Sequence, residues 1–139
     1  MDKNNLFYLC SLIESISRTT HLSKKETIQY FDKEYLIHLY NVAEINHSLP
    51  IKQVTDEVIS HQSISYKKGT EHPKIPTVWD IGKVYSRLIR DISNETNWSD
   101  QLIEVYNSWI CDDIDNYHKP IYWQSRSYIK ECYLQHHIL

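Results

Sequence analysis

The stretch PTVWDIGKVYSRLI, at residues 76–89, decides the fold class of this chain. Apolar side chains recur in it and just after it at alternating spacings of three and four residues: Val78, Ile81, Tyr85, Leu88 and Ile92. That spacing places them along one side of an α-helix as a narrow apolar seam. The proline that opens the stretch is typical of the first position of a helix. We therefore expect an amphipathic helix that begins at Pro76 and packs its seam inward.

The same periodicity recurs along most of the chain. A first helix is expected over residues 5–20, with Leu6, Leu9, Ile13 and Ile16 as its apolar stripe. Further helices are expected to start at the following places: the capping-box pattern of Ser23 and Glu26, Asp32, Pro50, Ser99 and the region of Tyr128. With only 2 Gly and 4 Pro, the chain has few positions for tight hairpin turns. The sequence predicts an all-α helical bundle of about six or seven helices.

A break in the pattern suggests two lobes. Residues 62–76 lose the helical spacing and contain Gly69 and two prolines, which are typical of a loop. We expect an N-terminal helical lobe over residues 1–61, a linker or loop over 62–76, and a C-terminal helical lobe over 77–139. A chain of 139 residues is long enough for two small lobes that pack together.

Charge and cysteine usage narrow the classes of partner and compartment. The net charge of -3 argues against a general nucleic-acid binder, which needs an excess of positive charge. Cys10, Cys111 and Cys132 are an odd number without close pairing, which indicates reduced thiols buried as small apolar groups. The N-terminal residues do not resemble a signal peptide, and no apolar run has the length of a membrane span. We expect a cytoplasmic protein that does not contact the membrane.

No pattern of strong specificity indicates a metal site or catalysis. The candidate zinc ligands Cys111, His118 and Cys132, with either His136 or His137, have spacings that match no common zinc finger. The acidic run at 112–115 has no glycine and no closing glutamate for a Ca²⁺ loop, so we expect it to face solvent or a partner. The nucleophile elbow and the phosphate loop are both missing. We therefore expect no catalytic residues, no cofactor and no metal.

Two surface features are candidates for contact with a partner. Lys83, Arg87 and Arg90 fall on the outer face of the expected seam helix, where they form either a solvated face or a contact for phosphate or an acidic partner. Tyr122 and Trp123, with Arg126 nearby, combine the residue types that dominate protein interfaces. We expect these six residues to form a partner-binding surface, with the aromatic side chains as anchors and the cations steering association.

Nucleic-acid binding is the second hypothesis. Residues 22–41 have roughly the size of a helix-turn-helix, and Lys24 and Lys25 would join the basic stripe in contacting DNA. The would-be recognition helix, however, has a single basic residue, Lys33, at its start. A DNA-binding transcriptional regulator is therefore the alternative to a protein-binding module, and a helical nuclease or transferase is a third.

A resemblance supplies the class of partner. The segments Pro76–Ile89 and Leu102–Ser108, the tyrosine-rich end from Tyr117 to Tyr133, and the Ser23 cap are similar to those of a group of small uncharacterised bacterial proteins. Related short helical proteins are often encoded beside ADP-ribosyltransferase-like toxin genes. The resemblance implies an antitoxin or immunity protein that binds a cognate toxin, and it transfers no catalytic residues. It leaves the oligomeric state and the identity of the partner open.

Overall fold

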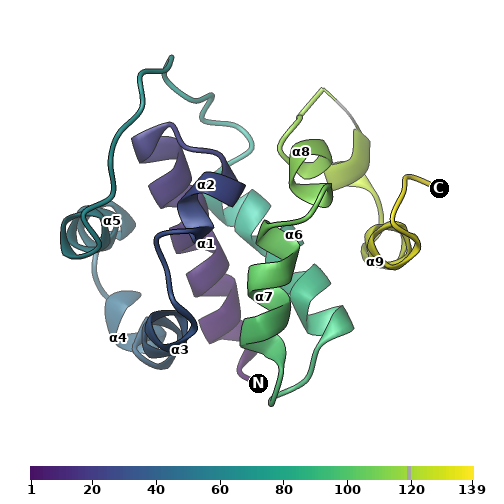
Figure 1. Cartoon of the computed structure of the whole chain (residues 1–139), viewed down its shortest axis with the longest axis horizontal. Helices are drawn as coiled ribbons and strands as arrows, with labels where there is room; N and C mark the ends of the chain where they lie inside the picture. The colour runs from purple at the N-terminus through teal and green to yellow at the C-terminus, as the bar shows by residue number, and fades with distance from the viewer. Residues whose placement is uncertain (119) are drawn as a thin grey trace.

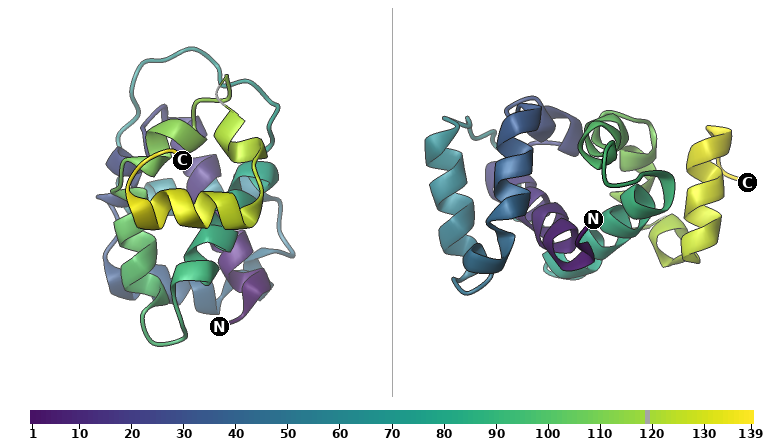
Figure 2. Two further views of the ribbon diagram at one scale, coloured as in Figure 1. Left: turned by 90° about the vertical axis from the view of Figure 1, so that its right-hand side faces the viewer. Right: turned by 90° about the horizontal axis from the view of Figure 1, so that it is seen from below.

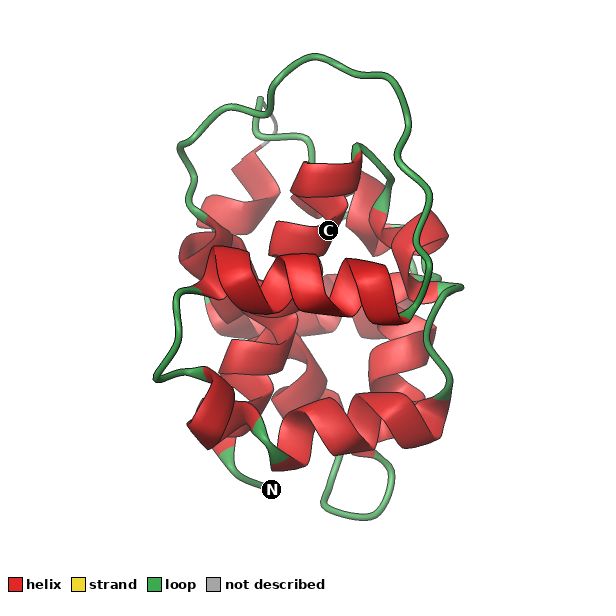
Figure 3. Cartoon of the chain, turned by 90° about the vertical axis from the view of Figure 1, so that its left-hand side faces the viewer, coloured by secondary structure: helices red, strands yellow, loops and turns green. Residues whose placement is uncertain are grey.

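The structure is a computed structural model that describes residues 1–118 and 120–139. In these residues it has nine α-helices, one 3₁₀ helix and no strands (Figure 3), which confirms the predicted all-α class. The elements are α1 (Lys3–Thr20), α2 (Lys24–Ile28), α3 (Lys33–Asn41), α4 (Ala43–Asn46), α5 (Ile51–His61), α6 (Val78–Ile92), α7 (Trp98–Tyr106), α8 (Ile110–Ile114), η1 (Pro120–Trp123) and α9 (Arg126–Gln135). The predicted count of six or seven is too low, because α4 and α8 are too short to show a helical period.

Helix α1 is the centre of the bundle. In Figure 1 it runs between α6 on one side and α3, α4 and α5 on the other. Every residue from Tyr8 to Ser17 is buried, so this helix is enclosed all round rather than along one stripe. The predicted apolar stripe is fully buried: Leu6, Leu9, Ile13 and Ile16.

Helices α1 and α6 form the largest interface of the molecule. They are in close contact at Gly82, where a Cβ atom would lie 2.8 Å from the Cα atom of Ser11 and 2.2 Å from its Oγ. Glycine is therefore required here by the distance between the two backbones. The close approach fixes α6 firmly along the central helix.

The centre of the predicted seam of α6 is buried, whereas Val78 and Ile92 at its two ends are only half-buried. Ile81, Tyr85 and Leu88 are each at most 2% exposed. The helix begins at Val78 rather than at Pro76, so the predicted start is wrong. The reason is a capping box in which the Thr77 hydroxyl accepts from the Asp80 amide and the Asp80 carboxylate accepts from the Thr77 amide.

The backbone between α5 and α6 has no helix over residues 62–77 and arches over one end of the bundle (Figures 1 and 3), where the linker was predicted. Helices from either side of it pack together: α1 against α6, and both α2 and α3 against α7. The buried apolar residues of the two halves form a single core. That 1–61 and 77–139 are separate folding lobes stays a prediction.

Helix α9 lies on the outside of α6, at the opposite end of the molecule from α5 (Figure 2). Ser125 caps its first turn by accepting from the Tyr128 amide. Ile129, Cys132 and Tyr133 face inward. With the preceding 3₁₀ helix, α9 forms a wall that stands beside α6.

Candidate functional site

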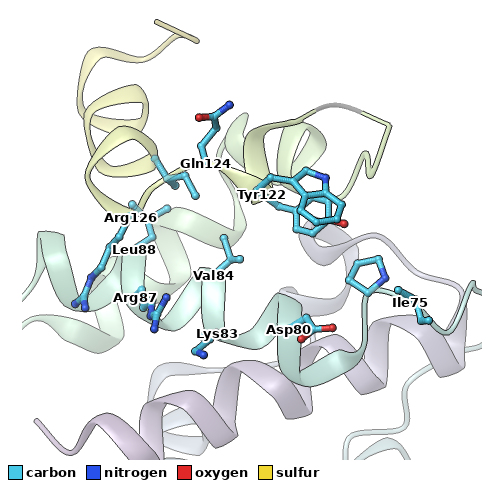
Figure 4. Close-up of a pocket in the computed structure, with 12 residues that line it drawn as sticks. Ile75, Asp80, Lys83, Val84, Arg87, Leu88, Tyr122, Gln124 and Arg126 are labelled. Atoms are coloured by element: carbon cyan, nitrogen blue, oxygen red, sulfur yellow. The ribbon is translucent and has the colours of Figure 1, made fainter.

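A groove lies between α6 and the wall formed by η1 and α9 (Figure 4). Its volume is about 480 Å³. Helix α6 forms one side, η1 and the start of α9 form the other, and the end of the loop before α6 lies at one end. The lining residues are Ile75, Pro76, Asp80, Lys83, Val84, Arg87, Leu88, Tyr122, Trp123, Gln124, Arg126 and Ile129.

The groove brings together residues that are far apart in the sequence and were selected as a partner-binding surface. Five of the six predicted residues line it: Lys83, Arg87, Tyr122, Trp123 and Arg126. Arg90 does not line it. The structure thus places these five side chains around one concave surface.

The groove has an apolar floor and an exposed aromatic rim. Leu88 and Ile129 are buried at its base, and the side chain of Trp123 is 72% exposed. The rings of Tyr122 and Trp123 lie 4.7 Å apart, so each supports the other. Ile75, 81% exposed, adds apolar surface at one end. An exposed tryptophan beside a concave apolar surface is typical of a binding site.

The charged residues of the groove differ in how they are engaged. Arg126 is held by Asp91, because its Nε and Nη2 atoms donate to the two carboxylate oxygens over 2.7 and 2.6 Å. Asp80 is held in the capping box of α6. Among the described residues, Lys83 and Arg87 make no ion pair. The groove therefore presents two cations to whatever enters it.

A second feature was not predicted: a buried charge cluster formed by Glu14, Arg18, Lys24 and Asp115. Glu14 is completely buried and Lys24 is 4% exposed. The Lys24 Nζ atom lies 2.6 Å from Glu14 Oε1, an ion pair without hydrogen-bond alignment, and donates to Asp115 Oδ2 over 3.2 Å. The Arg18 Nε atom donates to Glu14 Oε2 over 2.7 Å. Two cations and two carboxylates balance, as buried charges require.

The cluster shifts the pKa values of Glu14, Lys24 and Asp115. Burial alone would raise the pKa of Glu14, but the charges of Lys24 and Arg18 outweigh it, so that pKa lies below its usual value. Burial alone would lower the pKa of Lys24, and Glu14 and Asp115 together raise it. Burial raises the pKa of Asp115, although Lys24 opposes the shift. Glu14 and Lys24 are thus fixed in their charged forms.

A second concave site, of about 470 Å³, opens above this cluster. Lys24, Asp115, His72 and Tyr117 are among the residues that line it. Burial lowers the pKa of His72 and raises the pKa of Tyr117 to about 12. Titratable groups with shifted pKa values that converge on a cavity are a feature of catalytic sites and of structural ion-pair networks alike.

The charge cluster is linked to the groove through the loop and the C-terminal segment. The Arg18 Nη2 atom donates to the carbonyl of Pro76 over 2.7 Å. The edge of the Tyr117 ring packs against Tyr122 with 5.6 Å between the ring centres. Pro76 and Tyr122 both line the groove. Arg18 of the cluster therefore contacts the end of the groove at Pro76. Tyr117, whose hydroxyl donates to Glu14 over 3.4 Å, contacts the wall of the groove at Tyr122.

Two sequence interpretations need correction at this cluster. Asp115 was expected to face solvent or a partner, but it accepts hydrogen bonds from Lys24 and from the Tyr85 hydroxyl, the latter over 2.9 Å. Lys24, assigned to a DNA-contacting surface in the alternative hypothesis, is buried. One signal pointed to the cluster: Glu14 lies inside the apolar stripe of α1, four residues before Arg18.

The remaining candidates lie elsewhere. Cys10, Cys111 and Cys132 are free and buried, as expected, and burial raises the pKa values of Cys10 and Cys111 to about 12. In the part of the chain that the structure describes, no three His, Cys, Asp or Glu side chains come close enough to hold a metal ion. On α3, Lys33 pairs with Asp100 over 3.1 Å. The helix-turn-helix reading of residues 22–41 stays a prediction.

None of the helices in the described residues combines the length and apolarity needed to cross a bilayer. Comparisons with family models, with curated proteins and with solved structures found no match to the chain. The groove and the charge cluster are the structural features of this chain that bear on its function.

Proposed function

We propose that this chain is a non-catalytic, cytoplasmic protein-binding module that acts as the antitoxin or immunity partner in a bacterial toxin–antitoxin or defence system. The groove between α6 and α9 is the surface that holds the toxin. The class of partner comes from the resemblance of the chain to small helical proteins encoded beside toxin genes.

One observation carries the binding proposal. Trp123 is 72% exposed beside an apolar floor, and the chain brings Lys83 and Arg87 to the same groove from a distant part of the sequence. A partner that covers an exposed tryptophan ring gains free energy, because the apolar ring surface is removed from water. Tryptophan, tyrosine and arginine, which all line this groove, are enriched at the centres of protein interfaces.

The test is neutralisation in cells. The protein encoded beside the gene for this chain is induced in a bacterial host, with and without this chain, and growth is recorded. We expect the chain to restore growth and Trp123→Ala to lose most of that protection. Tyr66→Ala is the matched control, since Tyr66 is an aromatic residue that is 60% exposed in the loop before α6 and lies outside the groove.

Two outcomes would count against the proposal. If the neighbouring protein arrests growth and this chain gives no protection, the antitoxin role fails. If Trp123→Ala protects as well as the wild type, the partner binds elsewhere. Circular dichroism of Trp123→Ala separates loss of binding from loss of folding, and we expect an unchanged helical spectrum because the ring is exposed.

An enzyme, a helical nuclease or transferase, is the second candidate, favoured by the cavity above the charge cluster. Lys24 and Glu14 are poorly suited to exchange protons with a bound molecule, since their charges hold each other in place. Asp115 is the better candidate for an acid or base, because burial raises its pKa. RNA cleavage or transfer from a nucleotide that is abolished in Asp115→Asn, with folding intact, would favour this alternative.

A further inference from the structure

The charges of the groove indicate the chemistry of its occupant, an inference that rests on the groove being the partner-binding site. Lys83 and Arg87 stand one helical turn apart on α6 and both line the groove (Figure 4). Neither forms an ion pair with a described residue. Two cations free on one side of a groove attract an anion, and they favour a partner that carries two negative charges at matching positions.

The surface between and behind these cations is apolar. Val84 lies between them in sequence and lines the groove, and the buried side chains of Leu88 and Ile129 form its floor. Trp123 stands exposed at the opposite wall. A site of this kind accommodates an apolar side chain whose neighbours carry carboxylates.

We propose that the groove binds a short acidic segment of the partner protein. Two carboxylates of the segment pair with Lys83 and Arg87, and an apolar side chain between them packs on Val84 and Leu88 under Trp123. Side chains one turn apart on a helix are about 6 Å apart. Acidic residues four apart on a helical segment match that spacing, and an apolar residue between them can turn toward Val84 and Leu88.

A single-stranded nucleic acid fits the same groove less well. A backbone of phosphates is followed by several cations along a groove. Here Arg126 is already held by Asp91, and the carboxylate of Asp80 lies among the lining residues. Bases stack on aromatic rings, and the two rings that line the groove, Tyr122 and Trp123, lie on the wall opposite the cations, whereas the floor is aliphatic. Charge and floor together favour an acidic peptide.

The probe is a random peptide library displayed on phage and selected on the full-length chain. We expect the selected peptides to share two Asp or Glu residues around one large apolar residue. A synthetic, fluorescein-labelled peptide of the strongest sequence is then measured by anisotropy. Its affinity should fall about tenfold when both acidic residues become Gln or Asn, and it should weaken as salt is added.

Charge reversal on the protein gives the complementary measurement. Arg87→Glu should weaken the selected peptide by tenfold or more, about 1.4 kcal/mol. Lys52→Glu is the matched control, since it changes the net charge equally on α5, at the far end of the molecule, where Lys52 is 82% exposed. The control should leave the affinity unchanged, because a distant exposed charge is screened.

The outcomes separate this inference from the proposed function. If the selected peptides carry no excess of Asp and Glu, or bind Arg87→Glu as tightly as the wild type, the acidic occupant is wrong. If a single-stranded oligonucleotide competes the peptide away with a steep salt dependence, nucleic acid replaces it. In either case toxin neutralisation that depends on Trp123 would still support the protein-binding module. Failure of neutralisation alone would reject the antitoxin role and leave the acidic-segment result standing.

Discussion

Lys24 and Glu14 form an ion pair of 2.6 Å, and their side chains are 4% and 0% exposed to solvent. The pair joins α2 to the central helix α1, and Asp115 extends it to the end of α8. Ion pairs this deeply buried rarely add stability over apolar residues of the same shape, but breaking one leaves an uncompensated charge. The pair therefore acts as a strict geometric constraint on three segments of the chain.

Glu14→Gln should strongly destabilise the fold. The change removes the negative charge of Glu14. The two buried cations, Lys24 and Arg18, are then balanced by a single carboxylate, that of Asp115. We expect the free energy of unfolding to fall by about 3–5 kcal/mol, measured by urea denaturation. Glu131→Gln, at an exposed position of α9, is the control and should not shift the midpoint. Equal midpoints for the two variants would mean that the cluster contributes nothing to stability.

Stability should decline as the solution is acidified below about pH 7, in part through His72. Burial, and further the charges of Arg18 and Lys24, place the pKa of His72 in the folded chain below its ordinary 6.5. The folded state therefore holds neutral His72, and the unfolded state takes up the proton first. This loss begins below pH 6.5 and ends at the folded pKa.

Two carboxylates act at lower pH with opposite signs. The lowered pKa of Glu14 makes its contribution present above its unfolded value of 4.5, and that contribution is lost as pH falls through the folded pKa. The raised pKa of Asp115 partly offsets this loss of stability, because the folded state binds that proton more tightly.

Thermal melts at a series of pH values below about 7 measure the contribution of His72. The melting temperature should fall less steeply with pH for His72→Gln than for the wild type. His137→Gln, in the exposed C-terminal tail, should follow the wild type.

Gly82→Ala should destabilise the fold although alanine is the better helix former. Alanine favours a helix interior by about 1 kcal/mol. Its Cβ would meet backbone atoms of Ser11 at 2.8 Å, so α1 or α6 has to move. We expect the strain to exceed the gain and to lower the free energy of unfolding by about 1–3 kcal/mol. Ser86→Ala, on the same helix, tests whether any added apolar character has this effect; a more stable Gly82→Ala would disprove the close packing.

The helices were predictable because their signals are local. The seam of Ile81, Tyr85 and Leu88 follows from spacing alone, and so does the cap at Ser23. The start of α6 was misplaced because Thr77 outcompetes Pro76 as the determinant of the first turn. Periodicity identifies a buried face and says nothing of what it packs against. The close contact between Gly82 and Ser11 therefore could not be predicted from the sequence.

For the groove and the charge cluster, too, local signals were visible in the sequence and the tertiary arrangement was not. Residue types were enough to select Trp123 and Arg126, because tryptophan, tyrosine and arginine are the residue types that dominate interface hot spots. Their arrangement around Lys83 and Arg87 depends on how α9 packs on α6, which no local pattern contains. Glu14 meets Lys24 and Asp115 across three segments, and only the folded chain brings them together.

The pairing of Arg126 with Asp91 leads to a last prediction, on how Arg126 serves the groove. Arg126 was selected as a direct partner contact, yet its guanidinium already donates to both oxygens of Asp91 on α6. If its role is to hold α9 in place as a wall, removing either side of the pair should weaken a selected acidic peptide equally. Arg126→Gln and Asp91→Asn should then have matching effects on affinity, and the double variant should be no worse than either. Each single variant should lose about 1 kcal/mol or less of stability, because the pair is partly exposed.

If Arg126 instead contacts the partner directly, the opposite is expected for Asp91→Asn. The freed Arg126 would bind the acidic peptide more tightly than in the wild type, and only Arg126→Gln would weaken binding. Peptide anisotropy on the three variants distinguishes the two roles.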